Sequence, residues 1–135
     1  MIPEDRKKST NPISQNVMER WLIHTLTGLC IFHEPAQDSE DLFSSFIKAL
    51  NDFINQKFGI GQKVMDILLP GMHLMIEYGR FTYIVIAAPR ISSTIRNESR
   101  TFIESFERDY EDILKREILD ITKLDRGRNL FGGFF

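Results

Sequence analysis

The chain has 135 residues, with 17 Lys and Arg against 19 Asp and Glu, and 42% of its residues are hydrophobic. This length fits one domain, and the composition is that of a folded protein rather than a disordered one. A net charge of −2 argues against nucleic acid as a partner, and no apolar run reaches the roughly 18 residues of an integral membrane segment. The single cysteine and the lack of a recognisable secretory signal predict a cytoplasmic protein.

Residues 1–14 are polar, contain two prolines and three adjacent basic residues, and predict a flexible arm. The next apolar residues recur every four positions and predict a helix that ends at about Glu19. Strand-forming residues then fill residues 21–26 and 29–32, and Thr27-Gly28 between them is typical of a hairpin turn. The first part of the domain is therefore expected to be a helix followed by two antiparallel strands.

A longer helix is predicted between the N-cap candidates Asp38 and Ser39 and the terminating Gly59. Apolar residues recur within it at three- and four-residue spacing, which is the helical period. The main stripe consists of Leu42, Phe46, Ala49, Leu50 and Phe53, and it is widened by Phe43, Ile47, Ile54 and Phe58. A stripe this wide predicts a helix that is covered on more than one side.

Three further strands are predicted over residues 64–69, 72–78 and 81–88, where the hydrophobic period changes. They are separated by two turn dipeptides, Pro70-Gly71 and Gly79-Arg80, so an antiparallel meander is expected. Because residues 81–88 are apolar on both faces, this strand is expected at the centre of the sheet, covered by helices.

The last helix is predicted from about Ser93, with apolar residues at helical spacing as far as Ile121 and charged residues between them. Its charged run, which includes Glu107, is interpreted as a solvated face. Gly127 is expected to end any helix. Residues 125–135 have no amphipathic period and are interpreted as an apolar tail that contains three phenylalanines.

The order strand-strand-helix-strand-strand-strand-helix predicts an α+β domain over residues 15–124, with a five-stranded antiparallel sheet flanked by helices. We expect both helices to cover one face of the sheet. The chain holds more Phe, Met and Ile than one small core needs, which indicates a surface for a partner. The candidate partner-binding residues are Phe43, Ile47, Ile54, Arg96, Arg100, Phe131, Phe134 and Phe135. The three C-terminal phenylalanines are expected to dock on the same chain or on a neighbouring one, with an unstructured end as the alternative.

Few residues could carry chemistry. His24 and His33 lie on adjacent predicted strands near Cys30, where they could form a metal site or supply a base to a nucleophilic thiol. The alternative is structural, because a free cysteine in a strand usually acts as a small apolar residue. No Cys/His pair has ligand spacing, so we expect no catalytic residue, no metal and no cofactor, and the protein is predicted not to be an enzyme.

Four segments resemble the longin/roadblock-like superfamily, and in particular its small archaeal longin-like members. They are GLCIF (28–32), DLFSSFIKAL (41–50), IEYGRFTYIV (76–85) and FIESFERDY (102–110). The resemblance implies a profilin-like fold without enzymatic activity. It also implies a homo- or heterodimer that serves as a platform or regulator for small GTPases or membrane-trafficking assemblies, with peripheral membrane association through partners.

Two other functions stay open at this stage. A PAS-like small-ligand sensor also sets helices on a five-stranded antiparallel sheet, and its pocket would be lined by Cys30, His24 or Met75. An enzyme would use Cys30 with a histidine. The first alternative predicts a cavity over the sheet, and the second predicts a thiol beside an imidazole.

Overall fold

The computed structural model of the chain describes residues 17–34, 40–117, 119–128 and 131, with the side chains of residues 40–42 left out. The elements follow each other in the predicted order: β1 (Glu19–His24), β2 (Cys30–Glu34), α3 (Glu40–Phe58), β3 (Asp66–Leu69), β4 (Met72–Tyr78), β5 (Thr82–Ala88), α4 (Ser93–Leu114) and the 3-10 helix η1 (Ile121–Leu124). The predicted arm and Phe134 and Phe135 lie outside the described residues. The helix predicted up to Glu19 also lies almost wholly outside them, and Glu19 itself already belongs to β1.

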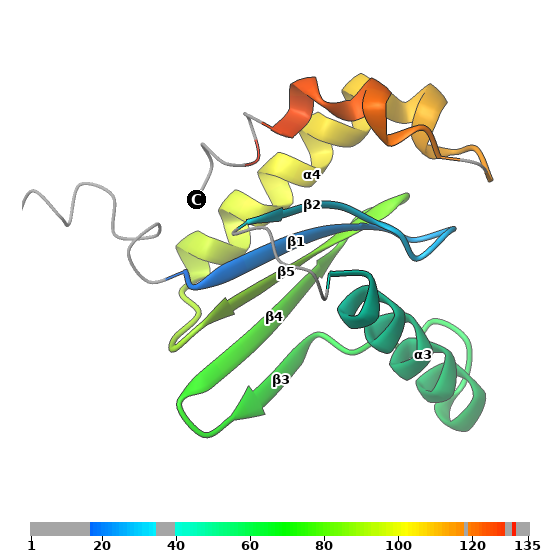
Figure 1. The fold of residues 1–135 in the computed structure, drawn as a ribbon. Coiled ribbons are helices and arrows are strands. Elements are labelled where there is room, and N and C mark those ends of the chain that lie inside the picture. Colours follow the sequence, from blue (N-terminus) through cyan, green and yellow to red (C-terminus); the bar gives the residue numbers. More distant parts are fainter. Residues whose placement is uncertain (1–16, 35–39, 118, 129–130, 132–135) are drawn as a thin grey trace, which may run out of the picture.

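The five strands form one antiparallel sheet in the order β2-β1-β5-β4-β3 (Figure 1). β5 lies at its centre, where Val85 faces Trp21 of β1 on one side and Ile76 of β4 on the other. Every residue of β5 is buried, as expected for a strand that is apolar on both faces. The predicted α+β class, the five-stranded antiparallel sheet and the central position of this strand are confirmed.

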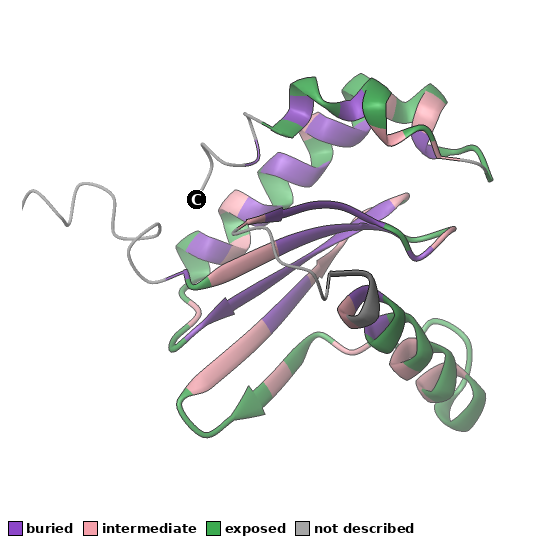
Figure 2. Ribbon diagram, viewed as in Figure 1, coloured by how far each residue is buried: buried purple, intermediate pink, exposed green. Residues whose placement is uncertain are grey.

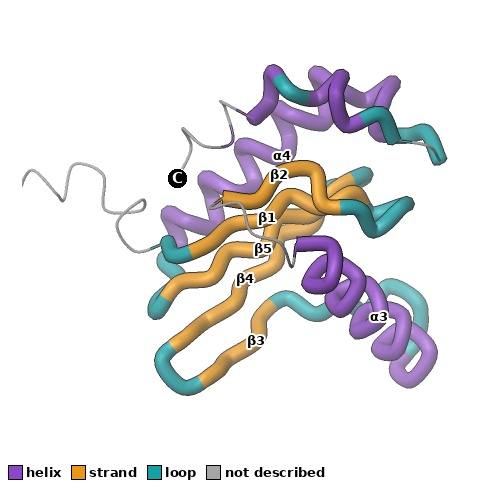
Figure 3. Tube along the Cα trace, in the orientation of Figure 1, coloured by secondary structure: helices purple, strands orange, loops and turns teal. Residues whose placement is uncertain are grey.

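α3 and α4 lie on opposite faces of the sheet, so the expectation that both cover one face is wrong (Figures 1 and 3). Ile47 of α3 shares a cluster of buried residues with Val85, whereas Phe102 of α4 shares a second cluster with Ile84 and Ile86. Successive side chains of a strand point to opposite faces, so neighbouring residues of β5 contribute to different clusters. A strand that is apolar on both faces needs a helix on each.

α3 contacts the sheet along a different stripe from the one predicted to be central. Ile47 is buried and Phe43 and Ile54 are partly buried, whereas Phe46 and Phe53 are 55% and 53% exposed. Three of the four residues expected to widen the stripe therefore form the core-facing side, whereas the fourth, Phe58, is exposed, and part of the main stripe is an outer flank. Spacing identifies apolar stripes on a helix, but the position of the sheet decides which stripe is buried.

α4 begins at Ser93 as predicted but ends at Leu114 instead of continuing to Ile121. The buried His24 at the end of β1 lies at this helix terminus, with Nε2 2.5 Å from the Leu114 carbonyl oxygen. Its other ring nitrogen, Nδ1, is 2.8 Å from Thr27 Oγ1 in the β1–β2 turn. The imidazole therefore joins the first hairpin to the C-terminal end of α4.

The chain beyond η1 packs into the core on the α4 side of the sheet. Phe131 is fully buried, and its ring centroid lies 5.5 Å from that of Phe32 and 5.3 Å from that of Phe102. Gly127, expected to end any helix, instead lies within a helical turn, where a Cβ would be 2.4 Å from Cε1 of Phe106. The glycine allows the backbone to approach this ring closely, and the core extends past the predicted domain boundary at residue 124.

Glu107 of α4 is buried and does not belong to a solvated face. Its carboxylate accepts hydrogen bonds from the backbone N–H groups of Arg80, Phe81 and Thr82 and from the Thr82 hydroxyl, all at 2.8–2.9 Å. A Cβ at Gly79 would lie 2.4 Å from one of the carboxylate oxygens, so the turn can approach Glu107 only with glycine there. The carboxylate therefore holds the β4–β5 turn against α4.

Candidate functional site

The exposed large apolar side chains of the described residues are concentrated around α3 and β3. Seven of the ten lie between residues 46 and 69, namely Phe46, Phe53, Phe58, Ile60, Met65, Leu68 and Leu69. Figure 2 shows the same contrast, with buried residues along the central strands and exposed ones along β3 and the outer side of α3. Apolar side chains gathered in one region of a surface mark interaction sites, whereas scattered ones do not.

β3 is an exposed edge of the sheet. Within the described residues it pairs with β4 alone, and Leu68 and Leu69 are 74% and 51% exposed. β2 forms the other edge, but four of its five residues are buried, and Arg128 and Phe131 lie against the ring of Phe32. The row of backbone donors and acceptors on an edge strand is a template for pairing with another strand. Of the two edges, β3 is the one with exposed apolar side chains.

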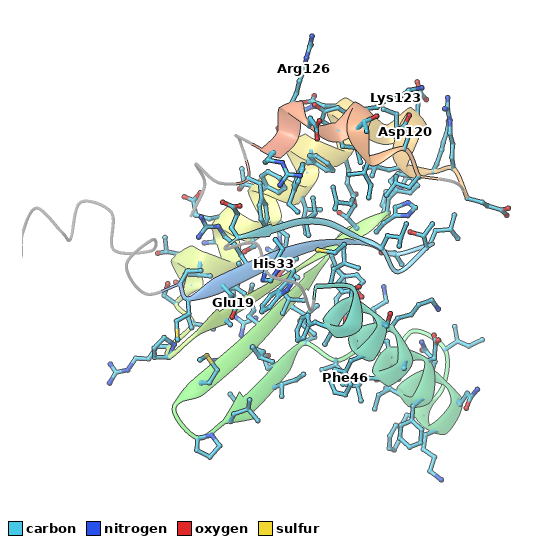
Figure 4. All side chains as sticks on the ribbon, viewed as in Figure 1. Glu19, His33, Phe46, Asp120, Lys123 and Arg126 are labelled. Atoms are coloured by element: carbon cyan, nitrogen blue, oxygen red, sulfur yellow. The ribbon has the colours of Figure 1, made fainter. Side chains whose placement is uncertain are left out.

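The outer flank of α3 adds two aromatic side chains to this surface. Phe46 and Phe53 are seven residues apart, which is about two helical turns, so they lie on the same side of the helix. Figure 4 shows the Phe46 side chain projecting from the side of α3 that is turned toward β3 in this view. α3 and β3 also border one buried cluster, because it includes Ile47 and Ile67 packs against it. We call Phe46, Phe53, Met65, Leu68 and Leu69 the apolar edge.

The residues of α3 predicted to bind a partner are instead part of the chain's own packing. Ile47 is fully buried, and the ring of Phe43 stacks on Trp21 with their centroids 4.3 Å apart. Ile54 is partly buried. The exposed aromatic side chains of this helix lie one flank away, at Phe46 and Phe53.

The two predicted arginines lie on the other face of the sheet, in ion pairs with strand residues. Arg96 Nη2 is 2.6 Å from Asp66 Oδ1 on β3, and Arg100 Nε is 3.2 Å from Glu77 Oε2 on β4. His73 also lies 2.7 Å from Asp66. Burial alone would raise the pKa of the Asp66 carboxyl, but the hydrogen bonds from Arg96 and His73 outweigh it and lower the pKa. The arginines are thus not brought together with Phe43, Ile47 or Ile54.

The Asp66 pairs predict a small, pH-dependent effect on stability. We expect Asp66→Asn to lower the free energy of unfolding at pH 7 by less than about 1 kcal/mol, because solvent screens partly exposed pairs. The carboxylate's contribution is full above its ordinary pKa of 3.8 and is lost as the pH falls through the lower folded-state pKa. Urea unfolding should therefore separate the two proteins at pH 7, and their difference should shrink at a pH well below 3.8. A difference of equal size at both pH values would contradict this assignment.

The candidate catalytic and metal-binding residues are not brought together. His24 faces α4, whereas His33 stacks on Trp21 on the α3 side and lies 2.9 Å from Glu19 (Figure 4). The Cys30 thiol is buried and donates to the Phe32 carbonyl oxygen at 3.2 Å. Within the described residues, no group of three or more His, Cys, Asp or Glu side chains could hold a metal ion. The described helices also include none that is long and apolar enough to cross a membrane.

The five-stranded antiparallel sheet, with α3 on one face and α4 on the other, is consistent with the longin/roadblock-like fold. A crystal structure of a Roadblock/LC7 domain from Streptomyces avermitilis is similar to this chain, with a TM-score of 0.57 and 20% sequence identity over 71% of this chain and 86% of that one. The sequence matches no family model and no curated protein. The resemblance predicted from sequence is confirmed at the level of the fold.

The sequence did not identify the apolar edge as the candidate site. Met65, Leu68 and Leu69 fall within the strand that the sequence predicts over residues 64–69. A signal was present, because Leu68 and Leu69 are adjacent and must point to opposite faces of any strand. However, a strand that is apolar on both faces is typical of the centre of a sheet. The position of β3 at the edge therefore becomes clear only from the strand order.

Proposed function

We propose that this chain is a non-enzymatic protein-interaction module that forms a dimer and serves, in the cytoplasm, as a platform for a small GTPase or a membrane-trafficking assembly. The observation that carries the proposal is the apolar edge, an edge strand with exposed leucines next to exposed aromatic residues of α3. The fold likeness to a Roadblock/LC7 domain supports it.

The dimer is proposed to form between two copies of the apolar edge. Two identical edge strands can pair antiparallel across a two-fold axis, which extends the sheet and uses the same surface on both subunits. Such pairing removes Leu68 and Leu69 from water and brings the outer flanks of the two α3 helices toward each other. A closed two-fold contact of this kind also protects the exposed strand edge from further association.

Charged substitutions on β3 test this interface. We expect the double variant Leu68→Lys and Leu69→Lys to be a monomer where the wild type is a dimer, because charged side chains on an edge strand oppose pairing. Light scattering coupled to size exclusion gives the molar mass. Leu26→Lys is the matched control, since Leu26 is 53% exposed in the β1–β2 turn and lies outside the apolar edge. Equal masses for the double variant and the wild type would refute the interface.

The platform role predicts that the dimer binds a small GTPase with a preference for one nucleotide state. Among the predicted partner residues on α4, Arg100 is the more accessible to such a protein, because its side chain is 59% exposed. The Arg100→Glu variant should bind the GTPase at least tenfold more weakly. Calorimetry with the GDP form and with a non-hydrolysable GTP form measures this. A component of a membrane-trafficking assembly could bind the dimer instead of a small GTPase. If no small GTPase from the same source binds while the dimer stays intact, the GTPase role is lost and the interaction module remains.

The residues predicted to line the pocket of a PAS-like sensor are not brought together. Met75 is buried in the cluster on the α4 side, Cys30 in the cluster on the α3 side, and His24 is bonded to the end of α4. These three residues therefore do not line one pocket.

A further inference from the structure

A small cavity of about 130 Å³, bordered mainly by residues with polar side-chain groups, lies between α3 and the sheet. Lys48 and Asn55 border it from α3, and each lies two positions from Phe46 or Phe53, about 200° around the helix. The cavity is therefore on the flank of α3 opposite to the apolar edge. Its properties can be tested without disturbing the proposed dimer.

Tyr83 on β5 is one of the residues that border this cavity, and its hydroxyl is unsatisfied within the described part of the chain. The residue is only 3% exposed, and its hydroxyl has no hydrogen-bond partner among the described residues. Burial raises the pKa of this hydroxyl, with smaller contributions from Tyr78, Cys30 and Asp52, so it stays protonated and is a donor at neutral pH. Buried polar groups nearly always have a partner, so this hydroxyl calls for an acceptor that the described residues do not supply.

Tyr78, the other tyrosine that borders the cavity, differs from Tyr83 because its hydroxyl has hydrogen-bond partners. Its hydroxyl donates to the Val64 carbonyl oxygen at 2.6 Å and accepts from Asn51 Nδ2 at 2.8 Å. Asn51 Oδ1 in turn accepts from the backbone N–H of Val64. This network fixes the wall of the cavity, whereas the Tyr83 hydroxyl beside it has no such partner among the residues that the structure describes.

The charged groups around the cavity favour an anion. Lys48 and Asp52 are joined at 3.2 Å and balance each other. Lys63 Nζ lies 4.7 Å from the ring centroid of Tyr78, and no ion pair joins it to a carboxylate of the described residues. Asn55 uses its Oδ1 to accept from Gly61 N–H, which leaves its amide N–H groups as donors. The groups left for a ligand are thus an ammonium, a hydroxyl donor and an amide donor.

The volume limits the size of the ligand. A water molecule occupies about 30 Å³ of the liquid, so the cavity has room for more than one water. Sites for drug-sized ligands start at roughly 300 Å³, well above the 130 Å³ available here. A group with a few oxygen atoms fits these limits, and a whole nucleotide does not.

We propose that this cavity binds a small oxyanion, a phosphate or carboxylate group, that accepts hydrogen bonds from Tyr83 and Asn55 and is held electrostatically by Lys63. Access to the buried hydroxyl requires the neighbouring side chains to shift. Lys48 and Lys63 are exposed and can do so. The bound oxyanion links α3 to the sheet and stabilises the folded chain.

Thermal unfolding of the full chain with sodium phosphate or sodium acetate, against sodium chloride at equal ionic strength, tests the proposal. A ligand that binds only the folded state raises Tm in a saturable, concentration-dependent way. A saturable rise with phosphate alone identifies a phosphate site, and one with acetate alone identifies a carboxylate site. If neither anion gives a saturable rise in Tm, the proposal is overturned. A linear rise in Tm that all variants share reflects the general stabilisation by excluded salts, and it overturns the proposal as well.

Two variants and one control locate the response. Tyr83→Phe keeps the ring and removes only the unpaired hydroxyl, so we expect it to fold with unchanged or higher stability and to bind the anion at least tenfold more weakly. Lys63→Gln should weaken binding by a similar factor. Lys57→Gln, in the last turn of α3 and not among the residues that border the cavity, should keep the wild-type response. Equal responses in all four proteins would show that the anion binds elsewhere and would overturn the assignment.

Discussion

Glu107→Ala is expected to lower the free energy of unfolding by at least about 3 kcal/mol. The substitution leaves the N–H groups of Arg80, Phe81 and Thr82 and the Thr82 hydroxyl without their acceptor. Each unsatisfied buried donor costs about 1–3 kcal/mol, and bonds to a charged acceptor lie at the upper end. Urea unfolding measures the loss.

Glu104→Ala is the control for this prediction. Glu104 lies on the same helix but is exposed, so its removal should change stability by less than about 0.5 kcal/mol. Hydrogen exchange provides a second readout, because the amides of residues 80–82 should lose protection in Glu107→Ala even under conditions where the chain stays folded. If both variants unfold at the same urea concentration, Glu107 does not hold the turn.

Phe131→Ala is expected to cost about 3–5 kcal/mol, the range for truncating a buried phenylalanine. Its ring fills space between Phe32 and Phe102, and the alanine leaves a cavity there. Phe58→Ala is the matched control, because Phe58 is exposed at the end of α3 and should change stability little. Equal small effects on the urea midpoint would place Phe131 outside the core.

The fold was predictable because its signals are local. Turn dipeptides at Pro70-Gly71 and Gly79-Arg80 separate strands, the helical period reveals residues 40–58, and a strand that is apolar on both faces must be central. Each of these signals lies within a few residues. They specify which elements form and in what order, and the resemblance to longin/roadblock-like proteins rests on that order.

The candidate site was less predictable because it depends on contacts between distant residues. The spacing in α3 reveals two apolar flanks, and only the position of the sheet decides that Ile47 is buried and Phe46 is exposed. Glu107 looks like one more member of a charged run until the β4–β5 turn, about 25 residues earlier, is placed against it. The exposure of β3 likewise follows from the strand order, which no local pattern encodes.

Sedimentation equilibrium of the wild-type chain tests the central claim most directly. Association through the apolar edge predicts a molar mass of twice the 15.8 kDa of the chain at tens of micromolar, with reversible dissociation on dilution. The double variant Leu68→Lys and Leu69→Lys should give 15.8 kDa at the same concentration. A wild-type mass of 15.8 kDa across this range would contradict the proposal that two copies of β3 and α3 form the working unit.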